Sequence, residues 1–332
     1  MQKTAIVVTT IAPPKPVMTT LAAGAAERGM GFIVAGDDSS PPGFTLPGCD
    51  YYDIPRQLES GFRTAVAARR RHYARKNIAY LVAIRSGAEV IIETDDDNYP
   101  LPSFWEPRQR RRQAAAALGP GWVNVYRYFS DSLIWPRGFP LDCIHQWQAP
   151  CSSLSIADFD APIQQGLADQ APDVDAIYRL IFSDPVYFRR HSAIALPPRC
   201  WCPFNSQNTT WWSDAFPLLY LPSSCTFRMT DIWRSFVAQR IAWENDWSLL
   251  FHAASVRQER NAHDLLRDFA DEVPGYVHNR TIAERLEALT LTPGLDSIPE
   301  NMRLCYEVFV RERWVDKTEL IVLDTWLTDL GT

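Results

Sequence analysis

Three adjacent carboxylates, Asp95, Asp96 and Asp97, directly follow the apolar, β-branched run at residues 90–92. Carboxylates this close repel one another, and each raises the pKa of the next unless a cation neutralises them. A hard divalent cation such as Mg²⁺ or Mn²⁺ prefers oxygen ligands and would do so. It could then bridge to a diphosphate and stabilise that group as it leaves. An exposed acidic turn is the alternative, but the preceding buried strand favours metal binding at this acidic triplet (residues 95–97).

Lys76 and Asn77 precede the acidic triplet within a segment that has helical periodicity. A cation in the helical layer could face the phosphates of a nucleotide, and an amide could hydrogen-bond a sugar or a base edge. Taken alone, the pair would be an ordinary surface lysine and a polar helix residue. The nearby triplet is the reason to consider it part of a site.

Asp231 opens a predicted helix after a polar stretch. One interpretation is a first-turn or capping acid that the helix dipole stabilises. The other is a carboxylate that faces an acceptor and serves as general base for an inverting transfer. The two interpretations are compatible, because the N-terminus of a helix can point into a cleft.

The elements that must position these residues alternate between strand and helix over the first hundred residues. Such alternation predicts a mostly parallel sheet with helices on both faces, in which ligands bind beyond the carboxyl ends of the strands. Two acidic clusters follow such strand ends, Asp37 with Asp38, and the acidic triplet. Strands are expected at residues 4–10, 31–35, 50–54 and 89–93, and helices at residues 17–28 and 60–85.

The rest of the chain divides into a middle region and a helical one. Residues 119–227 are rich in Pro, Trp, Tyr and Cys, which indicates loops and short strands. From residue 230 the pattern becomes helical, and we expect a catalytic domain at residues 1–240 with a helical C-terminal extension at residues 241–332. Helices are predicted at residues 231–244, 259–272, 281–288, 299–312 and 317–329.

Composition excludes several classes of protein. The 332 residues are 46% hydrophobic and 22% charged, with a net charge of −6, which argues against disorder and against global attraction to nucleic acid or an anionic membrane. Arginine clusters at residues 69–71 and 108–112 leave a nucleic-acid partner as a minority alternative to solvated helix faces. No membrane span or signal peptide is recognisable and the seven cysteines form no regular framework, so we expect a cytoplasmic location.

Several segments together resemble the STELLO-type glycosyltransferase family and, more distantly, the reversibly glycosylated polypeptides, which act as arabinopyranose mutases. The strongest are RKNIAYLVAI at residues 75–84 and GAEVIIETDDDN at residues 87–98. RMTDIWRSFVAQR at residues 228–240, QERNAHDL at residues 258–265 and PDVDAIYR at residues 172–179 follow in the order of the family. They cover most of the chain, which makes the resemblance more specific than the acidic triplet alone.

The resemblance implies a GT-A fold, in which a DxD motif binds a divalent metal, Mn²⁺ or Mg²⁺, and the nucleotide diphosphate. Asp95 and Asp97 take the DxD role, and Lys76 with Asn77 lie where the family holds the nucleotide sugar. Asp37 lies where GT-A enzymes commonly contact the base or ribose. A late histidine often completes the metal site in such enzymes, and His263, followed by His252, is the candidate here.

The leading hypothesis is therefore a metal-dependent glycosyltransferase that moves a sugar from a nucleoside-diphosphate sugar to an acceptor that the sequence does not identify. The alternatives are a nucleotide-sugar mutase and a non-catalytic protein that binds sugar nucleotides. Product analysis without an added acceptor separates the first two, and ligand binding without turnover identifies the third.

Overall fold

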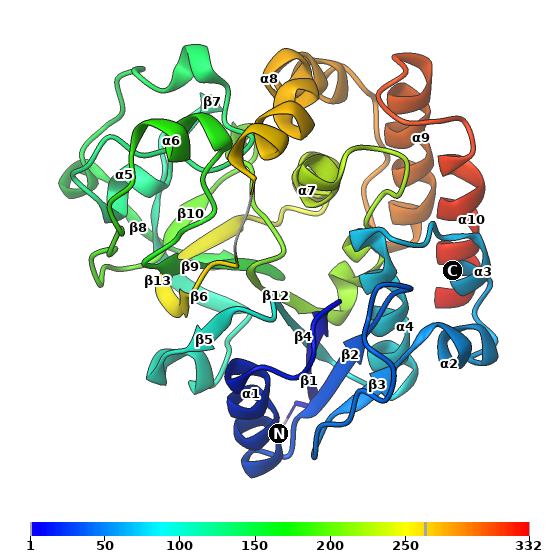
Figure 1. The fold of residues 1–332 in the computed structure, drawn as a ribbon. Coiled ribbons are helices and arrows are strands. Elements are labelled where there is room, and N and C mark those ends of the chain that lie inside the picture. The colour runs from blue at the N-terminus through cyan, green and yellow to red at the C-terminus, as the bar shows by residue number, and fades with distance from the viewer. Residues whose placement is uncertain (1, 262–263, 332) are drawn as a thin grey trace.

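A computed structural model describes residues 2–261 and 264–331, and one large sheet runs through its centre (Figure 1). Within these residues eleven strands form this sheet, in the order β3-β2-β1-β4-β12-β9-β13-β10-β6-β8, with β5 paired to β13; β7 and β11 form a separate pair. The strands are β1 (Thr4–Thr9), β2 (Gly31–Ala35), β3 (Asp50–Tyr52), β4 (Val90–Thr94), β5 (Asn98–Pro100), β6 (Arg111–Ala116), β7 (Gly121–Trp122), β8 (Ile156–Asp160), β9 (Ile163–Asp169), β10 (Ile194–Leu196), β11 (Cys200–Trp201), β12 (Asn208–Trp212) and β13 (Leu249–Gln258).

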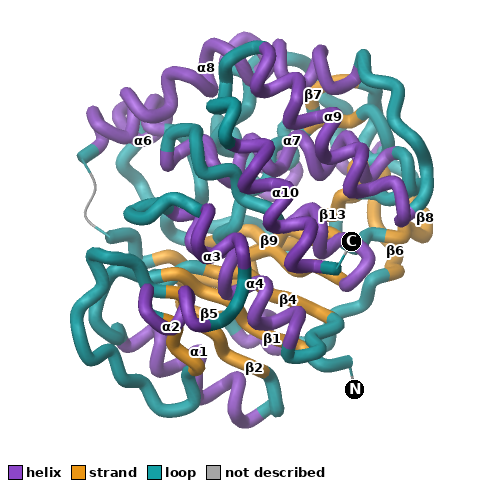
Figure 2. The backbone as a smooth tube through the Cα atoms, turned by 90° about the vertical axis from the view of Figure 1, so that its right-hand side faces the viewer, coloured by secondary structure: helices purple, strands orange, loops and turns teal. Residues whose placement is uncertain are grey.

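Helices lie on both faces of the sheet, and Figure 2 shows the strands between the helical layers. The helices are α1 (Pro16–Glu27), α2 (Ile54–Glu59), α3 (Arg63–Ala67), α4 (Lys76–Arg85), α5 (Tyr126–Phe129), α6 (Ala176–Ile181), α7 (Thr230–Trp243), α8 (Leu265–Glu287), α9 (Ile298–Arg311) and α10 (Glu319–Leu330). The predicted α/β class with a helical C-terminal region is confirmed.

Strands β1 to β4 form the parallel part of the sheet and agree with the four predicted strands. Alternate residues of each strand point to opposite faces, so Ile6 and Ile92 pack beneath α1 whereas Val7 and Ile91 pack beneath α4. Because parallel strands end at the same edge, the acidic triplet after β4 and Asp37 after β2 lie along one edge of the sheet.

Beyond β4 the direction of the strands varies. β12 runs antiparallel to β4 and to β9, and β13 runs parallel to β9, so β4, β9 and β13 all end at the edge that carries the acidic triplet. β13 follows residue 240, where we placed the end of the catalytic domain, and it pairs with β9 inside the central sheet. The two-domain division stays a prediction.

Two of the predicted helical segments have different bounds in the structure. Residues 60–85 do not form one helix, because a break between α3 and α4 contains Arg71 in the left-handed region with φ 54°. The helix predicted from residue 259 begins instead at Leu265, where the Asp264 side chain accepts hydrogen bonds from the backbone N–H groups of Leu266 and Arg267. It continues past Pro274 and includes residues 281–287, which we predicted as a separate helix.

A buried ion pair ties α7 to the central sheet. The guanidinium of Arg234 in α7 donates to both carboxylate oxygens of Glu93 in β4, at 2.8 and 3.0 Å. Both side chains are almost completely buried, and Tyr80 and Trp211 also donate to Glu93. A carboxylate can be buried at low energetic cost only when it is paired with an opposite charge and fully hydrogen-bonded. The pair therefore holds the start of α7 close to the end of β4.

Candidate functional site

Asp95 is the most exposed member of the acidic triplet and contacts the helical layer. Its Oδ1 accepts a hydrogen bond from the Tyr73 hydroxyl at 2.7 Å and lies 3.3 Å from Nζ of Lys76. Burial raises the pKa of Asp95 to about 6, against the opposing effect of the Lys76 charge. Oδ2 of Asp95 accepts no hydrogen bond from the described residues, so one carboxylate oxygen is available to a ligand.

Lys76 is fully buried, and its ammonium group contacts Asp95 from the protein interior. Nζ donates to the backbone carbonyls of Thr94 and Ser206 at 2.9 and 3.2 Å and to the Tyr73 hydroxyl at 2.8 Å. The lysine thus supplies a compensating charge beside Asp95 and joins β4 to the loop that precedes β12.

Asp96 and Asp97 share the side-chain amide of Asn261, at 3.4 and 3.2 Å, but their other neighbours differ. Nζ of Lys15 lies 3.2 Å from Asp96, which also accepts a hydrogen bond from the Thr10 hydroxyl. Oδ1 of Asp97 accepts from the Gln258 side chain at 3.1 Å, and Oδ2 accepts from the backbone and side-chain N–H groups of Asn261 at 3.4 and 3.2 Å. Burial raises the pKa of Asp97, and the hydrogen bond from Gln258 opposes that rise.

These contacts bear on the predicted metal. Among the described residues, no three His, Cys, Asp or Glu side chains are grouped to hold a metal ion by themselves. Mg²⁺, however, usually takes one or two protein carboxylates, several waters and the phosphates of a substrate. The free Oδ2 of Asp95 fits that requirement. His263 lies outside the described residues, and His252 bonds Gln164 at 2.7 Å instead of facing the triplet.

Asp37 and Asn77 both hold backbone segments in place. The carboxylate of Asp37 accepts from the backbone N–H groups of Asp38 and His72, at 2.7 and 2.8 Å. The amide of Asn77 is fully buried and bonds both the N–H and the carbonyl of Leu221, each at 2.9 Å. Their predicted contacts with a nucleotide stay predictions, while the structure gives each a structural role.

Asp231 lies in the first turn of α7 and forms a two-point ion pair with Arg137, at 2.9 and 3.0 Å. Arg137 forms a similar pair with Asp173, and all three side chains are buried. Burial alone would raise the pKa of Asp231, but the charge and hydrogen bonds of Arg137 outweigh it and lower the pKa to about 2. Asp231 makes no capping hydrogen bond at the start of α7.

A chain of hydrogen bonds connects Asp231 to the acidic triplet. The backbone N–H of Ser206 donates to Asp231 at 3.1 Å, and its hydroxyl, 2.6 Å from the Tyr73 hydroxyl, can donate to Tyr73, which donates to Asp95. Tyr73, Ser206 and Arg137 were not predicted from the sequence. Tyr73 lies one helical turn before Lys76, which is a weak signal, whereas nothing local distinguishes the other two.

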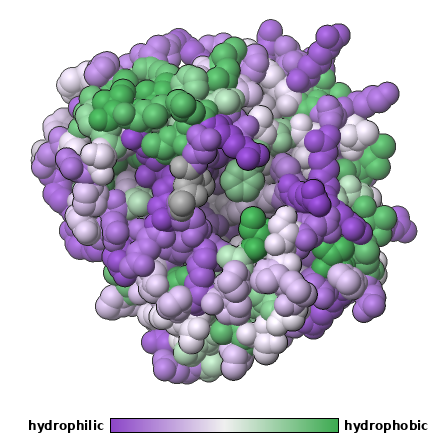
Figure 3. Space-filling view, viewed as in Figure 1, coloured by the Kyte–Doolittle hydropathy of each residue, from purple (hydrophilic) through white to green (hydrophobic). Residues whose placement is uncertain are grey.

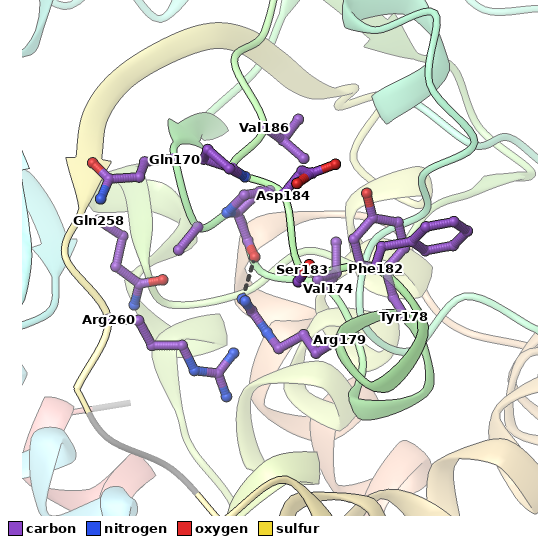
Figure 4. Close-up of a pocket in the computed structure, with 13 residues that line it drawn as sticks. Gln170, Val174, Tyr178, Arg179, Phe182, Ser183, Asp184, Val186, Gln258 and Arg260 are labelled. Carbon is purple, nitrogen blue, oxygen red and sulfur yellow. Dashed lines mark hydrogen bonds between the residues drawn. The ribbon is translucent and has the colours of Figure 1, made fainter.

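A cavity of about 410 Å³ opens next to the acidic triplet, at the ends of β9 and β13. Gln258 belongs to both, because it lines the cavity and bonds Asp97. In Figure 4 the side chains of Arg179 and Arg260 point toward one another on one side of the cavity, and the rings of Tyr178 and Phe182 lie away from Gln258. The lining thus combines aromatic surface, amides and guanidinium groups, a mixture that suits a polar organic ligand.

The surface around this region is mostly polar, with one apolar patch. In Figure 3 hydrophilic residues surround a hollow near the centre of the face, and an apolar patch lies over α6. The exposed apolar side chains of this segment are Leu180, Ile181 and Phe182. Phe182 also lines the cavity, so the patch continues into it.

Most arginines of the two predicted basic clusters do not form a free cationic track. Several are paired with carboxylates from distant parts of the chain, which reduces the charge available to a nucleic-acid backbone. The pairs are Arg69 with Asp316, Arg70 with Asp38, Arg110 with Asp160 and Asp214, and Arg111 with Asp160. In the part of the chain that the structure describes, no helix has both the length and the apolar composition needed to cross a bilayer.

Comparison with known proteins agrees with the resemblance noted in the sequence. Residues 228–332 match the family model described as STELLO glycosyltransferases. Two proteins of Arabidopsis thaliana, "Probable glycosyltransferase STELLO1" and "Probable glycosyltransferase STELLO2", are each 28% identical to the chain, over 240 and 236 residues, covering 65% of the chain. The chain spans 31% of the length of each.

Among solved structures, the "Crystal Structure of a Mycobacterial Protein" aligns with a TM-score of 0.44 and 9% identity, over 84% of this chain and 74% of that one. The sequence matches are the informative comparison: the family model covers the C-terminal third of the chain, and the two relatives, which match over 65% of it, are named as probable glycosyltransferases. The chain is thus similar to the STELLO glycosyltransferases, and the resemblance expected from its motifs is confirmed.

Proposed function

We propose that this chain is a glycosyltransferase that binds a nucleoside-diphosphate sugar at the acidic triplet with the help of Mn²⁺ or Mg²⁺. The observation that carries the proposal is the position of the triplet. Three carboxylates end a buried strand at the carboxyl edge of the sheet, beside a cavity large enough for a polar organic ligand. Similarity to proteins named as glycosyltransferases supports the same conclusion.

Asp95 and Asp97 are the proposed metal ligands, with Asp96 beside them. A bound divalent ion would neutralise charge on the diphosphate as it leaves. Asp95 offers an oxygen without a partner among the described residues, whereas Asp97 would exchange hydrogen bonds from Gln258 and Asn261 for the ion. Lys76 holds Asp95 in position from the buried side.

Asp231 is better suited to positioning than to proton transfer. A general base works best when its pKa lies near the working pH, and a pKa of about 2 makes the carboxylate of Asp231 a weak base. Its contact with Ser206 instead orients a hydroxyl that contacts Tyr73, and Tyr73 in turn contacts Asp95. We therefore propose that Asp231 acts on the metal and nucleotide site through Ser206 and Tyr73.

The cavity at the ends of β9 and β13 is the proposed acceptor side. It lies on the opposite side of the acidic triplet from Asp37, the predicted base or ribose contact, because β2 and β9 flank β4 in the order of the sheet. Gln258 connects the cavity to Asp97, so an acceptor bound there would adjoin the diphosphate.

Thermal stabilisation by a panel of nucleoside diphosphates and their sugars, with and without Mn²⁺, tests the proposal. We expect one nucleotide to raise the melting temperature only when metal is present, and Asp95→Asn and Asp97→Asn to abolish the rise. Asp158→Asn, an exposed aspartate in β8, is the matched control and should respond like wild type. If no nucleotide stabilises the wild type, or both triplet variants respond like the control, the proposed site is wrong.

A further inference from the structure

A second cavity, of about 220 Å³, lies on the face of the sheet opposite α7. Successive residues of β9 point to opposite faces of the sheet. Ile163 and Leu167 point into the core beneath the helices, whereas Gln164 and Gly166 lie on the other face and line the cavity. His252, the second histidine considered for the metal site, lines it, but the acidic triplet, Lys76 and Asp37 do not. Its volume is below the range usual for pockets that hold drug-sized ligands, about 300–1,000 Å³.

Two guanidinium groups at this cavity have no carboxylate partner among the described residues. Arg108 donates to the backbone carbonyls of Phe104 and Ser103, at 2.9 and 3.3 Å, and its buried Nε has no acceptor. The side chain of Arg112 makes no hydrogen bond or ion pair within the described part of the chain, and this residue of β6 is exposed. Burial lowers the pKa of Arg108 to about 10, so this cation is partly desolvated.

The other charges lining the cavity do not neutralise these two arginines. Arg190 forms its own ion pair with Asp169, at 2.7 Å. Among the lining residues Glu106 is the single carboxylate; it is exposed and makes no ion pair with either arginine within 4.0 Å in the described residues, although its charge raises the pKa of both. A local positive charge in a chain with net charge −6 is therefore concentrated here.

Gln164 and His252 on the floor of the cavity use their hydrogen-bond donors within the protein. The amide of Gln164 donates to the backbone carbonyls of Gln109 and Ala161, each at 2.9 Å, so its oxygen accepts from Nε2 of His252 at 2.7 Å. Burial, and then the charges of Arg112 and Arg108, hold the pKa of His252 well below its usual range.

Two hydroxyls complete this floor. Those of Thr210 and Ser255 donate no hydrogen bond to another group of the described chain, although Ser255 accepts one from Asn208 at 2.9 Å. Both can therefore donate to a ligand.

We propose that this cavity is a binding site for a phosphate group, either free phosphate or the phosphate of a small metabolite. Guanidinium groups match the geometry of phosphate oxygens, and the partly buried Arg108, which forms no ion pair among the described residues, would gain from an anion. Hydroxyl donors on the floor would satisfy oxygens that the arginines do not reach. The proposal does not depend on the glycosyltransferase function, because it involves a different face of the sheet.

Calorimetric titration with inorganic phosphate tests the proposal. The protein is free of metal and nucleotide, and chloride keeps the ionic strength constant. We expect saturable binding by the wild type, and a loss of affinity of about tenfold or more in Arg112→Gln, as for removal of a charged hydrogen-bond donor. Thr210→Val should weaken binding by a smaller factor.

Arg111→Gln is the matched control, because Arg111 is the neighbouring residue of β6, is largely exposed and does not line the cavity. It should bind phosphate like wild type, and melting curves of all variants verify that they are folded.

A parallel titration with a hexose phosphate separates the two sources of the phosphate group. Tighter binding than that of inorganic phosphate assigns the site to a phosphorylated metabolite, and equal or weaker binding assigns it to free phosphate. Absence of saturable phosphate binding by folded wild type, or equal losses in Arg111→Gln and Arg112→Gln, would overturn the proposal.

Discussion

The hydroxyl oxygens of Tyr73 and Ser206 lie 2.6 Å apart, and this contact joins two parts of the site that are distant in sequence. On one side the Tyr73 hydroxyl donates to Asp95, and on the other the backbone N–H of Ser206 donates to Asp231, which leaves the Ser206 hydroxyl proton for Tyr73. The two hydroxyls therefore connect α7 to the acidic triplet, although the carboxylates of Asp231 and Asp95 do not contact one another directly.

Tyr73→Phe should weaken binding of the metal–nucleotide pair while the protein stays folded. The substitution removes the one hydroxyl that contacts Asp95, Lys76 and Ser206 together, and hydrogen bonds to charged groups contribute about 1.5–3 kcal/mol. Calorimetric titration with the nucleotide identified by the thermal panel measures the change. Tyr187→Phe, at an exposed tyrosine, is the control. Equal affinities of the two variants would show that this contact has no role in binding.

Arg137→Met should strongly destabilise the protein. Arg137 is the shared partner of Asp173 and Asp231, and its loss leaves two buried carboxylates without their main counter-charge. Removing one partner of a buried ion pair costs about 3–5 kcal/mol. Urea unfolding measures the loss of the free energy of unfolding. Arg189→Met removes an exposed pair with Asp131 and should cost about 0–1 kcal/mol, so similar losses in both variants would contradict this account.

The stability contributed by Asp231 should depend on pH. Its pKa is about 2 in the folded protein, below the value of about 3.9 expected for an unfolded chain. The ionised carboxylate therefore stabilises the fold fully above pH ~4, and this contribution, on the order of 2 kcal/mol, is lost as the pH falls toward 2.

The difference in the free energy of unfolding between wild type and Asp231→Asn should accordingly shrink over that range. Chemical denaturation at a series of pH values measures it, with Asp158→Asn as the exposed control. If the difference in the free energy of unfolding between wild type and Asp231→Asn is the same at pH 6 and at pH 3, a pKa shift of this size is excluded.

Filling the acceptor-side cavity should separate nucleotide binding from transfer. Ala171 lines that cavity, and Ala171→Trp would occupy its volume without changing any residue of the acidic triplet. We expect nucleotide-dependent stabilisation to remain and transfer to an acceptor to fall, while hydrolysis of the donor continues. Ala270→Trp, on the exposed face of α8, is the control. Undiminished transfer by Ala171→Trp would place the acceptor elsewhere.

Local patterns in the sequence were sufficient for the first part of the fold and for the acidic triplet. Strands β1 to β4 are short apolar runs that end in turn residues, and the triplet follows one of them directly. The roles of single side chains depended on distant partners instead. Asn77 bonds the backbone of Leu221, and Asp231 pairs with Arg137, so neither environment has a signal near the residue itself.

One strand after residue 240 had no local signal. We expected a helical extension at residues 241–332, and α8, α9 and α10 lie there, but β13 also forms ten residues of strand at the centre of the sheet. Its sequence, LLFHAASVRQ, has no regular alternation, because the strand is buried on both faces near its start and contains an irregularity between His252 and Val256. Strand pairing across the middle of a sheet is a property of the whole chain that a local window does not contain.

The central position of β13 also affects how the chain reaches its native state. A ribosome must release Gln258 before β9 and β10 can acquire the neighbour that lies between them. Contacts that join such distant positions slow folding, because a long loop must close before they form. Until then β9 exposes an edge of unpaired backbone N–H and C=O groups, so nascent chains that stop short of β13 should be substrates for chaperones and prone to aggregation.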